Sequence, residues 1–246
     1  MSIRHVVALS GGKDSTAMAL RLLECEPREY TFFCTPTGNE LPEMVAHWSR
    51  LEQLIGQPLV RVHPFEGDGL LALIREQKMI PNFRARFCTR ILKIEPAIEW
   101  LVEHSPCVQY VGLRYDEELR GGIYGEIPSV SQDYPLRRWG WRKQEVVEYL
   151  NRRGVTIPQR TDCGLCFYQQ LREWKRLHAE RPDRYNQGVQ IEREIGHTFR
   201  SPSRDTWPAD LAGLAKEFAR KDPRGYNGGL FDSMEGREGM CRHCTI

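Results

Sequence analysis

A short segment near the start of the chain, Ser10-Gly11-Gly12-Lys13-Asp14-Ser15, has the composition of a phosphate-binding loop. Two adjacent glycines let the backbone turn sharply and approach a ligand closely. Lys13 offers a cation, the serines offer hydroxyl donors, and Asp14 can cap a following helix or help to place a magnesium ion. The alternative interpretation is a plain glycine turn, and the spacing is not that of the G-x-x-x-x-G-K-[ST] loop. We expect this 10–15 loop to hold the phosphates of ATP or of a close relative.

Half of the eight cysteines form two C-x-x-C pairs, Cys163/Cys166 and Cys241/Cys244. Each pair can place two sulfurs on one metal, so together they have the ligands of a four-thiolate site. A [4Fe–4S] cluster and a structural Zn²⁺ are both chemically compatible with four thiolates. Buried thiols without metal are the alternative. A redox dithiol is less expected, because neither pair begins a helix directly after a strand.

Cys88 is the single thiol with a setting suited to chemistry, because it lies between Arg86 and Arg90. Neighbouring cations favour the thiolate, which is the nucleophilic form. Cys88 could carry sulfur as a persulfide, attack a substrate, or replace one of the C-terminal cysteines as a metal ligand beside Cys163 and Cys166. The remaining cysteines sit among apolar neighbours and are expected in the core: Cys25, Cys34 and Cys107.

The elements that must position these residues are short apolar runs alternating with amphipathic stretches. Strands are predicted at 5–9, 30–34, 59–63 and 108–113, and helices at 15–23, 41–55, 69–77, 94–103, 141–153, 167–180 and 210–220. Such alternation predicts an α/β fold in which a mainly parallel sheet carries helices on both faces. The 10–15 loop then joins the first strand to the first helix, where helix N–H groups and the helix dipole favour anions.

Bulk composition is that of an ordinary globular protein, with 246 residues, 40% hydrophobic and 28% charged residues and a net charge of +2. This balance gives no general case for nucleic-acid or membrane binding. No apolar stretch approaches the roughly 20 residues that span a bilayer, and the N-terminus does not resemble a signal peptide. We expect a cytoplasmic protein with a nucleotide-binding domain at 1–158 and a helical and loop extension at 159–246.

Four ordered motifs resemble those of the PP-loop superfamily, which includes the ATP pyrophosphatases and the phosphoadenosine phosphosulfate (PAPS) reductase family. Besides the 10–15 loop, they are T-G-N-E-L-P-E at 37–43, C-T-R-I-L-K-I-E-P at 88–96, G-L-R-Y-D-E-E at 112–118, and P-L with a following tryptophan and E-V-x-x-Y-L at 135–150. The similarity spans roughly residues 4–166 and implies an adenine nucleotide alpha hydrolase-like, Rossmann-like fold.

The resemblance implies an adenine nucleotide bound by the 10–15 loop, Thr37, Gly38, Lys93 and Arg114, with Arg120 as a further cation. In the family, one branch cleaves ATP between its α and β phosphates, and the other reduces a sulfonucleotide. Sulfonucleotide reductases tend to lack the loop lysine, so the intact loop favours Mg-ATP. Relatives that modify nucleic acids with sulfur often carry an iron–sulfur cluster, which favours [4Fe–4S] over Zn²⁺ for the cysteine pairs.

The leading hypothesis is therefore an ATP-dependent enzyme that adenylylates an acceptor, with Lys13, Asp14 and Cys88 as catalytic residues. The acceptor could be a small molecule or a nucleic acid, and a cysteine desulfurase or another thiol donor is a candidate partner. The alternatives are a sulfonucleotide (PAPS or APS) reductase and a non-catalytic nucleotide-binding module with structural zinc.

Overall fold

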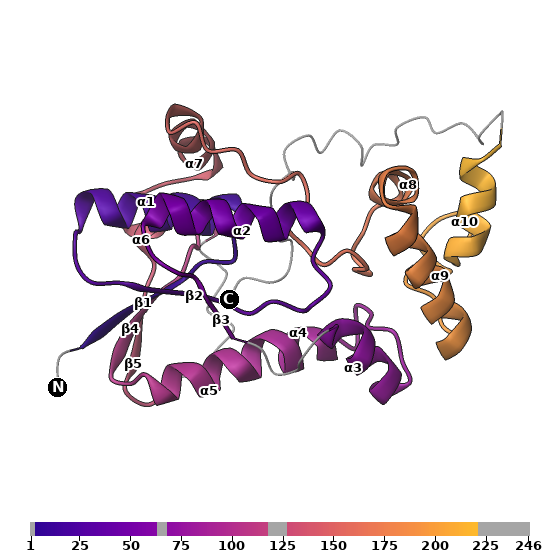
Figure 1. The fold of residues 1–246 in the computed structure, drawn as a ribbon, viewed down its shortest axis with the longest axis horizontal. Helices are drawn as coiled ribbons and strands as arrows, with labels where there is room; N and C mark the ends of the chain where they lie inside the picture. Colours follow the sequence, from indigo (N-terminus) through magenta and orange to yellow (C-terminus); the bar gives the residue numbers. More distant parts are fainter. Residues whose placement is uncertain (1–2, 63–67, 118–126, 221–246) are drawn as a thin grey trace.

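A five-stranded parallel sheet forms the centre of the computed structural model, which describes residues 3–62, 68–117 and 127–220 (Figure 1). The strand order is β3-β2-β1-β4-β5, and every neighbouring pair is parallel. The strands are β1 (Arg4–Ala8), β2 (Thr31–Cys34), β3 (Val60–Arg61), β4 (Cys107–Tyr110) and β5 (Val130–Asp133). The predicted fold class is confirmed.

Helices cover both faces of the sheet, as Figure 1 shows. On one face lie α1 (Lys13–Cys25), α2 (Pro42–Ile55), α6 (Pro135–Arg138) and α7 (Lys143–Arg152). On the other lie α3 (Gly69–Gln77), α4 (Phe87–Thr89), the π-helical turn η1 (Arg90–Ile94) and α5 (Glu95–Glu103). Beyond the sheet lie α8 (Leu171–Glu180), α9 (Pro182–Ile195) and α10 (Leu211–Phe218).

Strand β1 is apolar on both sides because each of its faces is covered. Val7 packs into the cluster formed with α1 and α2, whereas Val6 and Ala8 pack into the cluster formed with α5. Successive side chains of a strand point to opposite faces, so a strand between two helical layers becomes a continuous apolar run. This is the pattern from which the first strand was predicted.

The elements that were not predicted are strand β5, helix α9 and the short helical segments α4, η1, η2 (Tyr115–Glu117) and α6. Strand β5 falls in a stretch that was expected to be rich in turns, and it reads Val-Ser-Gln-Asp because it is an edge strand with only partly buried side chains. Helix α9 has a polar sequence and few buried residues, which include Tyr185 and Ile191. Helix α3 has the predicted ends, and the other predicted strands and helices are present with shifted ends. Residue 63 of the predicted third strand lies outside the described residues.

A second apolar cluster joins α8, α9 and α10 to the α/β part of the chain. Leu41 and the apolar face of α3 pack there with Leu165, Trp174 and Tyr185. The predicted domain boundary at residue 158 stays a prediction. A cluster with residues from both sides of that boundary does not show whether the chain folds as one unit or as two. No helix in the described ranges is both long and apolar enough to cross a membrane.

Candidate nucleotide site

The 10–15 loop follows β1 and turns the chain into α1. Gly11 has φ +87°, a conformation that L side chains rarely adopt, and a Cβ atom there would lie 2.3 Å from Met44 Cε. Helix α1 begins at Lys13 without a side-chain cap, and Asp14 lies in its first turn. The capping role considered for Asp14 is thus not adopted, and the first N–H groups of α1 remain at the loop.

Two side chains of α2 donate hydrogen bonds to backbone carbonyls of the 10–15 loop. His47 Nε2 donates to the Gly11 carbonyl at 3.1 Å, and Trp48 Nε1 donates to the Ser10 carbonyl at 3.0 Å. His47 is almost fully buried, and burial, with Arg50 as a lesser cause, lowers its pKa to about 4. Its Nδ1 has no hydrogen-bond partner. His47 is therefore a neutral donor that fixes the loop backbone at ordinary pH.

The loop lies where the sheet reverses its winding order. Strands β2 and β3 follow on one side of β1, and β4 and β5 lie on the other, so the carboxyl ends of β1 and β4 flank a topological switch point. Ligands of open α/β sheets bind at such points. Close approach there depends on Gly112, since a Cβ would lie 3.0 Å from the Ser15 backbone nitrogen.

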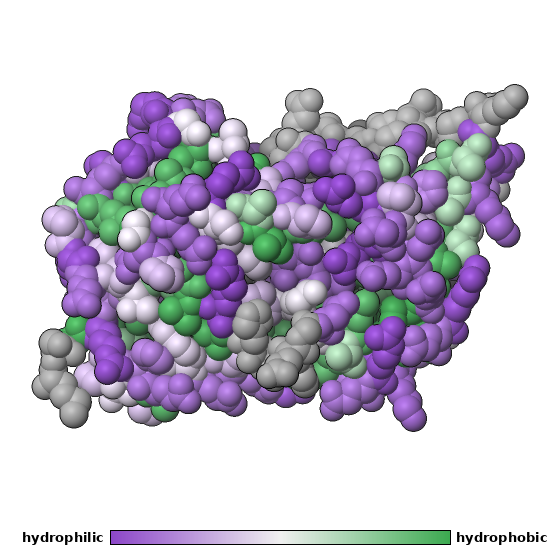
Figure 2. Space-filling view, viewed as in Figure 1, coloured by the Kyte–Doolittle hydropathy of each residue, from purple (hydrophilic) through white to green (hydrophobic). Residues whose placement is uncertain are grey.

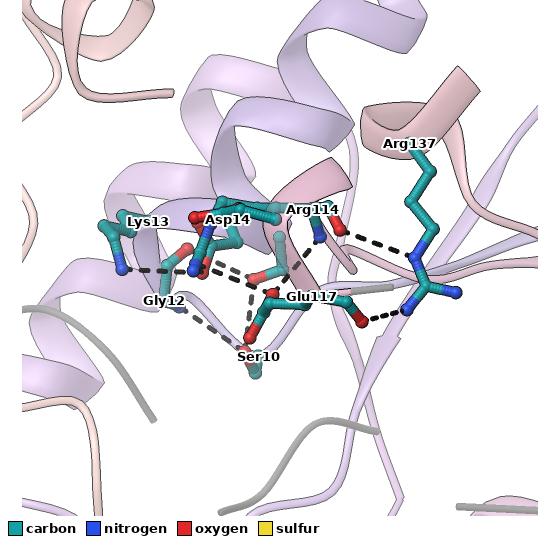
Figure 3. A network of polar contacts seen from close by, with 9 residues as sticks. Ser10, Gly12, Lys13, Asp14, Arg114, Glu117 and Arg137 are labelled. Atoms are coloured by element: carbon teal, nitrogen blue, oxygen red, sulfur yellow. Dashed lines mark hydrogen bonds and ion pairs between the residues drawn. The ribbon is translucent and has the colours of Figure 1, made fainter. Parts of the chain in front are cut away.

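A chain of charges crosses this switch point (Figure 3). Asp14 Oδ2 accepts from Arg114 Nη1 at 2.7 Å and lies 3.4 Å from Lys13 Nζ. Arg114 also pairs with Asp116 at 2.9 Å, and Glu117 Oε2 accepts from its backbone N–H at 3.2 Å. The structure thus brings together three predicted site residues from two strand ends.

Burial dominates the ionisation of these groups. It raises the pKa of Asp14, against the opposing effects of Lys13 and Arg114. It lowers the pKa of Lys13, and Asp14 partly restores it. The second oxygen of Asp14, Oδ1, is buried without a hydrogen-bond partner. Mg²⁺ is usually held by one or two carboxylates and by substrate phosphates, so this unpaired oxygen fits a Mg-nucleotide.

Hydroxyl groups complete the loop. Ser10 Oγ and Ser15 Oγ lie 3.1 Å apart, and Ser15 Oγ donates to the Gly12 carbonyl at 3.2 Å. Thr16 Oγ1 is buried without a partner in the first turn of α1. Hydroxyl groups can donate to an anionic ligand, and here they lie at the N-terminus of a helix, whose free N–H groups are further donors.

The segment after β2 connects this region to the first cysteine pair. Glu40 forms an antiparallel β-bridge with Cys163, and Gly164 N–H donates to the Asn39 carbonyl at 2.6 Å. The buried side chain of Asn39 accepts from Leu165 N–H at 3.0 Å. The predicted nucleotide contact Thr37 places its hydroxyl 3.2 Å from Cys163 Sγ and 2.8 Å from Glu40 Oε1. The cysteine loop, residues 163–166, is therefore docked against the 37–40 segment.

Two further side chains hold the cysteine loop. Arg160 donates through Nε and Nη2 to the Cys163 carbonyl, at 3.2 and 2.9 Å, and pairs with Glu173. Gln169 Nε2 donates to the Gly164 carbonyl at 2.7 Å. Because Gln169 is 1% exposed, this loop is fixed from within the protein and not by solvent-exposed contacts.

Cys88 lies in α4, half-buried, and packs against the second apolar cluster. Its segment adjoins the residues that follow Cys166: Phe83 makes edge contacts with Phe167 and Tyr168, and the Arg86 guanidinium lies 5.6 Å from the Tyr168 ring. Arg90 pairs with Glu95. Both arginines that flank Cys88 therefore contact other side chains: Arg86 lies over the Tyr168 ring, and Arg90 pairs with Glu95. Lys93 lies in η1, partly buried.

The predicted metal centre is only partly covered by the structure. Cys241 and Cys244 lie outside the described residues, as does Arg120. Among the residues that are described, no group of three or more His, Cys, Asp or Glu side chains could hold a metal ion. Cys88, Cys163 and Cys166 alone thus do not make such a group, and the four-thiolate site stays a prediction.

Several site residues were missed from the sequence. His47 and Trp48 hold the loop, Asp116 and Glu117 hold Arg114, and Lys143 is close enough to Lys13 to lower its pKa. The acidic pair was visible, since it belongs to the motif at 112–118. A buried histidine beside a tryptophan on an amphipathic helix gives no comparable signal.

Comparisons with known proteins bear on this arrangement. The model of the phosphoadenosine phosphosulfate reductase domain family matches residues 4–164. The chain belongs to this family. Among solved structures, it is similar to phosphoadenylyl-sulfate (PAPS) reductase from Candida auris in a phosphate complex, at 14% identity and a TM-score of 0.48, over 64% of this chain and 76% of that one. No curated protein matches the sequence. An adenine nucleotide is the type of substrate that fits the family.

Proposed function

We propose that this chain binds Mg-ATP at the 10–15 loop, cleaves it between the α and β phosphates and transfers AMP to an acceptor. The observation that carries the proposal is the intact loop with its buried lysine. Lys13 is 4% exposed, sits at the N-terminus of α1 and shares one carboxylate with Arg114. Pyrophosphate leaving from ATP gains negative charge, and a cation held in a water-poor site stabilises that charge most effectively.

The reaction requires that an acceptor oxygen attack the α-phosphorus, while the bond from that phosphorus to the bridging oxygen breaks and pyrophosphate departs. The first N–H groups of α1, Lys13 and the loop hydroxyls would hold the phosphates. Asp14 would hold Mg²⁺ through its unpaired oxygen, and the metal supplies charge neutralisation of the phosphates. Arg114 keeps Asp14 oriented, while Thr37, Gly38 and Lys93 complete the nucleotide contacts in this proposal.

The cysteines supply the sulfur or redox part of the proposed function. Cys163, Cys166, Cys241 and Cys244 would bind a [4Fe–4S] cluster or, as the alternative, Zn²⁺, and Cys88 would serve as the reactive thiol or as a replacement ligand. The hydroxyl of Thr37 beside Cys163 Sγ supports this proposal, because hydrogen bonds to ligating sulfurs tune such centres. A cluster supplies electrons or sulfur when it is bound.

Release of pyrophosphate from ATP, measured with a panel of small-molecule and nucleic-acid acceptors, tests the proposal. Lys13→Ala should lower kcat/KM roughly 100-fold or more, because it removes charge stabilisation at the leaving group. Lys175→Ala, which removes an exposed lysine of α8, is the matched control and should leave the rate unchanged. Absence of ATP binding by calorimetry would contradict the proposal.

The family match favours a second candidate, a sulfonucleotide reductase. This enzyme would release sulfite from PAPS or APS with electrons from a thiol donor, and its rate would depend on a cysteine thiol. Sulfite formation from PAPS with no pyrophosphate release from ATP would select this candidate over adenylyl transfer. Retention of function in both Lys13→Ala and Cys88→Ser would instead indicate a non-catalytic module.

A further inference from the structure

A cavity that shares no residue with the 10–15 loop lies between the start of α2 and helix α8. Its volume is about 220 Å³, which is below the range of roughly 300–1,000 Å³ typical of pockets for drug-sized ligands. Leu41 and Leu177 supply apolar wall, and charged and amide side chains supply most of the rest. The surface around α8 is mainly hydrophilic in Figure 2. The cavity therefore suits a small polar molecule.

The charges of this cavity do not cancel. Four arginines and three glutamates line it, which leaves one positive charge. Ion pairs join Arg160 to Glu173, Arg176 to Glu180 and Arg181 to Glu43. The fourth arginine, Arg172, is half-buried and has no carboxylate partner among the described residues. One guanidinium thus remains for an anionic group, which it can bind through two parallel N–H donors.

The cavity also has an acceptor that lacks a donor. Gln169 lines it and is 1% exposed, and its Oε1 has no hydrogen-bond partner because Nε2 faces the Gly164 carbonyl. Arg181 Nε, on another wall, is a buried donor without an acceptor. Unpaired buried polar atoms are costly, so a ligand that satisfies both would gain binding free energy.

We infer that this cavity binds a small carboxylate that also carries a hydroxyl or N–H donor. The carboxylate would pair with Arg172 and accept from Arg181 Nε, and the donor would bind Gln169 Oε1. None of the residues that line this cavity belongs to the 10–15 loop, so it is a separate site and not part of the proposed ATP site. Because Arg160 and Gln169 also hold the carbonyls of the cysteine loop, an occupant would contact the support of Cys163 and Cys166.

Three probes of similar size isolate the two recognition elements: L-lactate, propionate, which lacks the hydroxyl, and L-lactamide, which lacks the charge. In ligand-observed NMR titrations with the full chain, lactate should bind roughly tenfold more tightly than either analogue, as expected for one charged hydrogen bond. Arg172→Gln should weaken lactate binding by a similar factor. Arg193→Gln, an exposed arginine of α9 outside the cavity, is the matched control and should bind as the parent protein does.

Calorimetric ATP binding, measured in the same variants, separates this inference from the proposed function. ATP affinity should be unchanged by Arg172→Gln, with thermal melting as the check on folding. Equal lactate binding in Arg172→Gln and the parent, no binding of lactate, or tighter binding of inorganic phosphate than of lactate in an Arg172-dependent manner would each overturn the inference. Loss of preference for lactate over propionate in Gln169→Leu would support it.

Discussion

The 10–15 loop and the cysteine loop lie at the same edge of the sheet, where β1 and β2 end, but are held in different ways. The 10–15 loop joins two adjacent elements, β1 and α1, and its glycines and the first N–H groups of α1 are set by local backbone geometry. The cysteine loop is held by residues far away in sequence, such as Asn39 and Glu40. Local sequence therefore specifies the turn of the first loop, which His47 and Trp48 then hold, whereas the position of the second loop also requires contacts with a distant segment.

The ion pairs near the two loops differ in how deeply they are buried. At the 10–15 loop, Asp14 and Arg114 form a largely buried pair in which each group needs the other. Beside the cysteine loop, the Arg160–Glu173 pair is also largely buried, whereas the Arg176–Glu180 pair of α8 has both side chains well exposed to solvent. Buried pairs are costly to break, and exposed ones contribute little.

The largest expected effect is the loss of Arg114. Arg114→Ala would leave the buried carboxylate of Asp14 without its closest cation, at a cost of roughly 3–5 kcal/mol in unfolding free energy. Arg176→Ala, which breaks an exposed pair, should cost less than about 1 kcal/mol. Urea unfolding of both variants measures the difference. Equal costs would remove the distinction between the buried and the exposed pair.

The next effect is acid sensitivity of the 10–15 loop. His47 has a folded pKa of about 4, below its ordinary value of 6.5, so the unfolded chain binds more protons between these values. This contribution to stability is present above pH 6.5 and is lost as the pH falls toward 4. Hydrogen-exchange protection of the loop should decline over that window. His47→Gln should flatten the decline, and an unchanged slope in that variant would refute the assignment.

The C-terminal helices should respond to pH in the opposite direction. Glu192 accepts from Phe199 N–H at 2.9 Å and from Leu211 N–H at 2.6 Å, and burial raises its pKa to about 7 from an ordinary value of 4.5. The folded state then binds more protons between pH 4.5 and 7, so stability decreases as the pH rises through this window. Protection of α9 and α10 amides should be greater at pH 5 than at pH 7.5, and Glu192→Gln should abolish the difference. Parallel pH profiles for both regions would contradict the comparison.

The smallest effect concerns the docking of the cysteine loop. Asn39→Ala removes the acceptor for Leu165 N–H and should cost about 1–2 kcal/mol, since the freed N–H is buried. Amide exchange at Leu165 should accelerate, while exchange at Ser15 and Thr16 should not change. Asn39→Asp keeps an acceptor oxygen and is the control. Equal acceleration at both loops would show that they are not held independently.

The sequence predicted what depends on local pattern. The apolar runs of β1, β2 and β4 arise because these strands are covered on both faces, and the 10–15 loop arises from its glycines. Asp14 and Arg114 are 100 residues apart, and only the resemblance placed them in one site. Strand β5 and helix α9 were missed because their sequences are polar, and the contacts of His47, Trp48 and Asn39 were missed because they depend on tertiary packing.

The β-bridge between Glu40 and Cys163 means that the first sulfur pair takes its position partly from the segment that follows β2, far from it in sequence. Connecting segments between these two points can change in length at small entropic cost, because closure entropy grows slowly with loop size. Insertions in the surface turns between β5 and Arg160 should thus leave Cys163 at the same edge of the sheet.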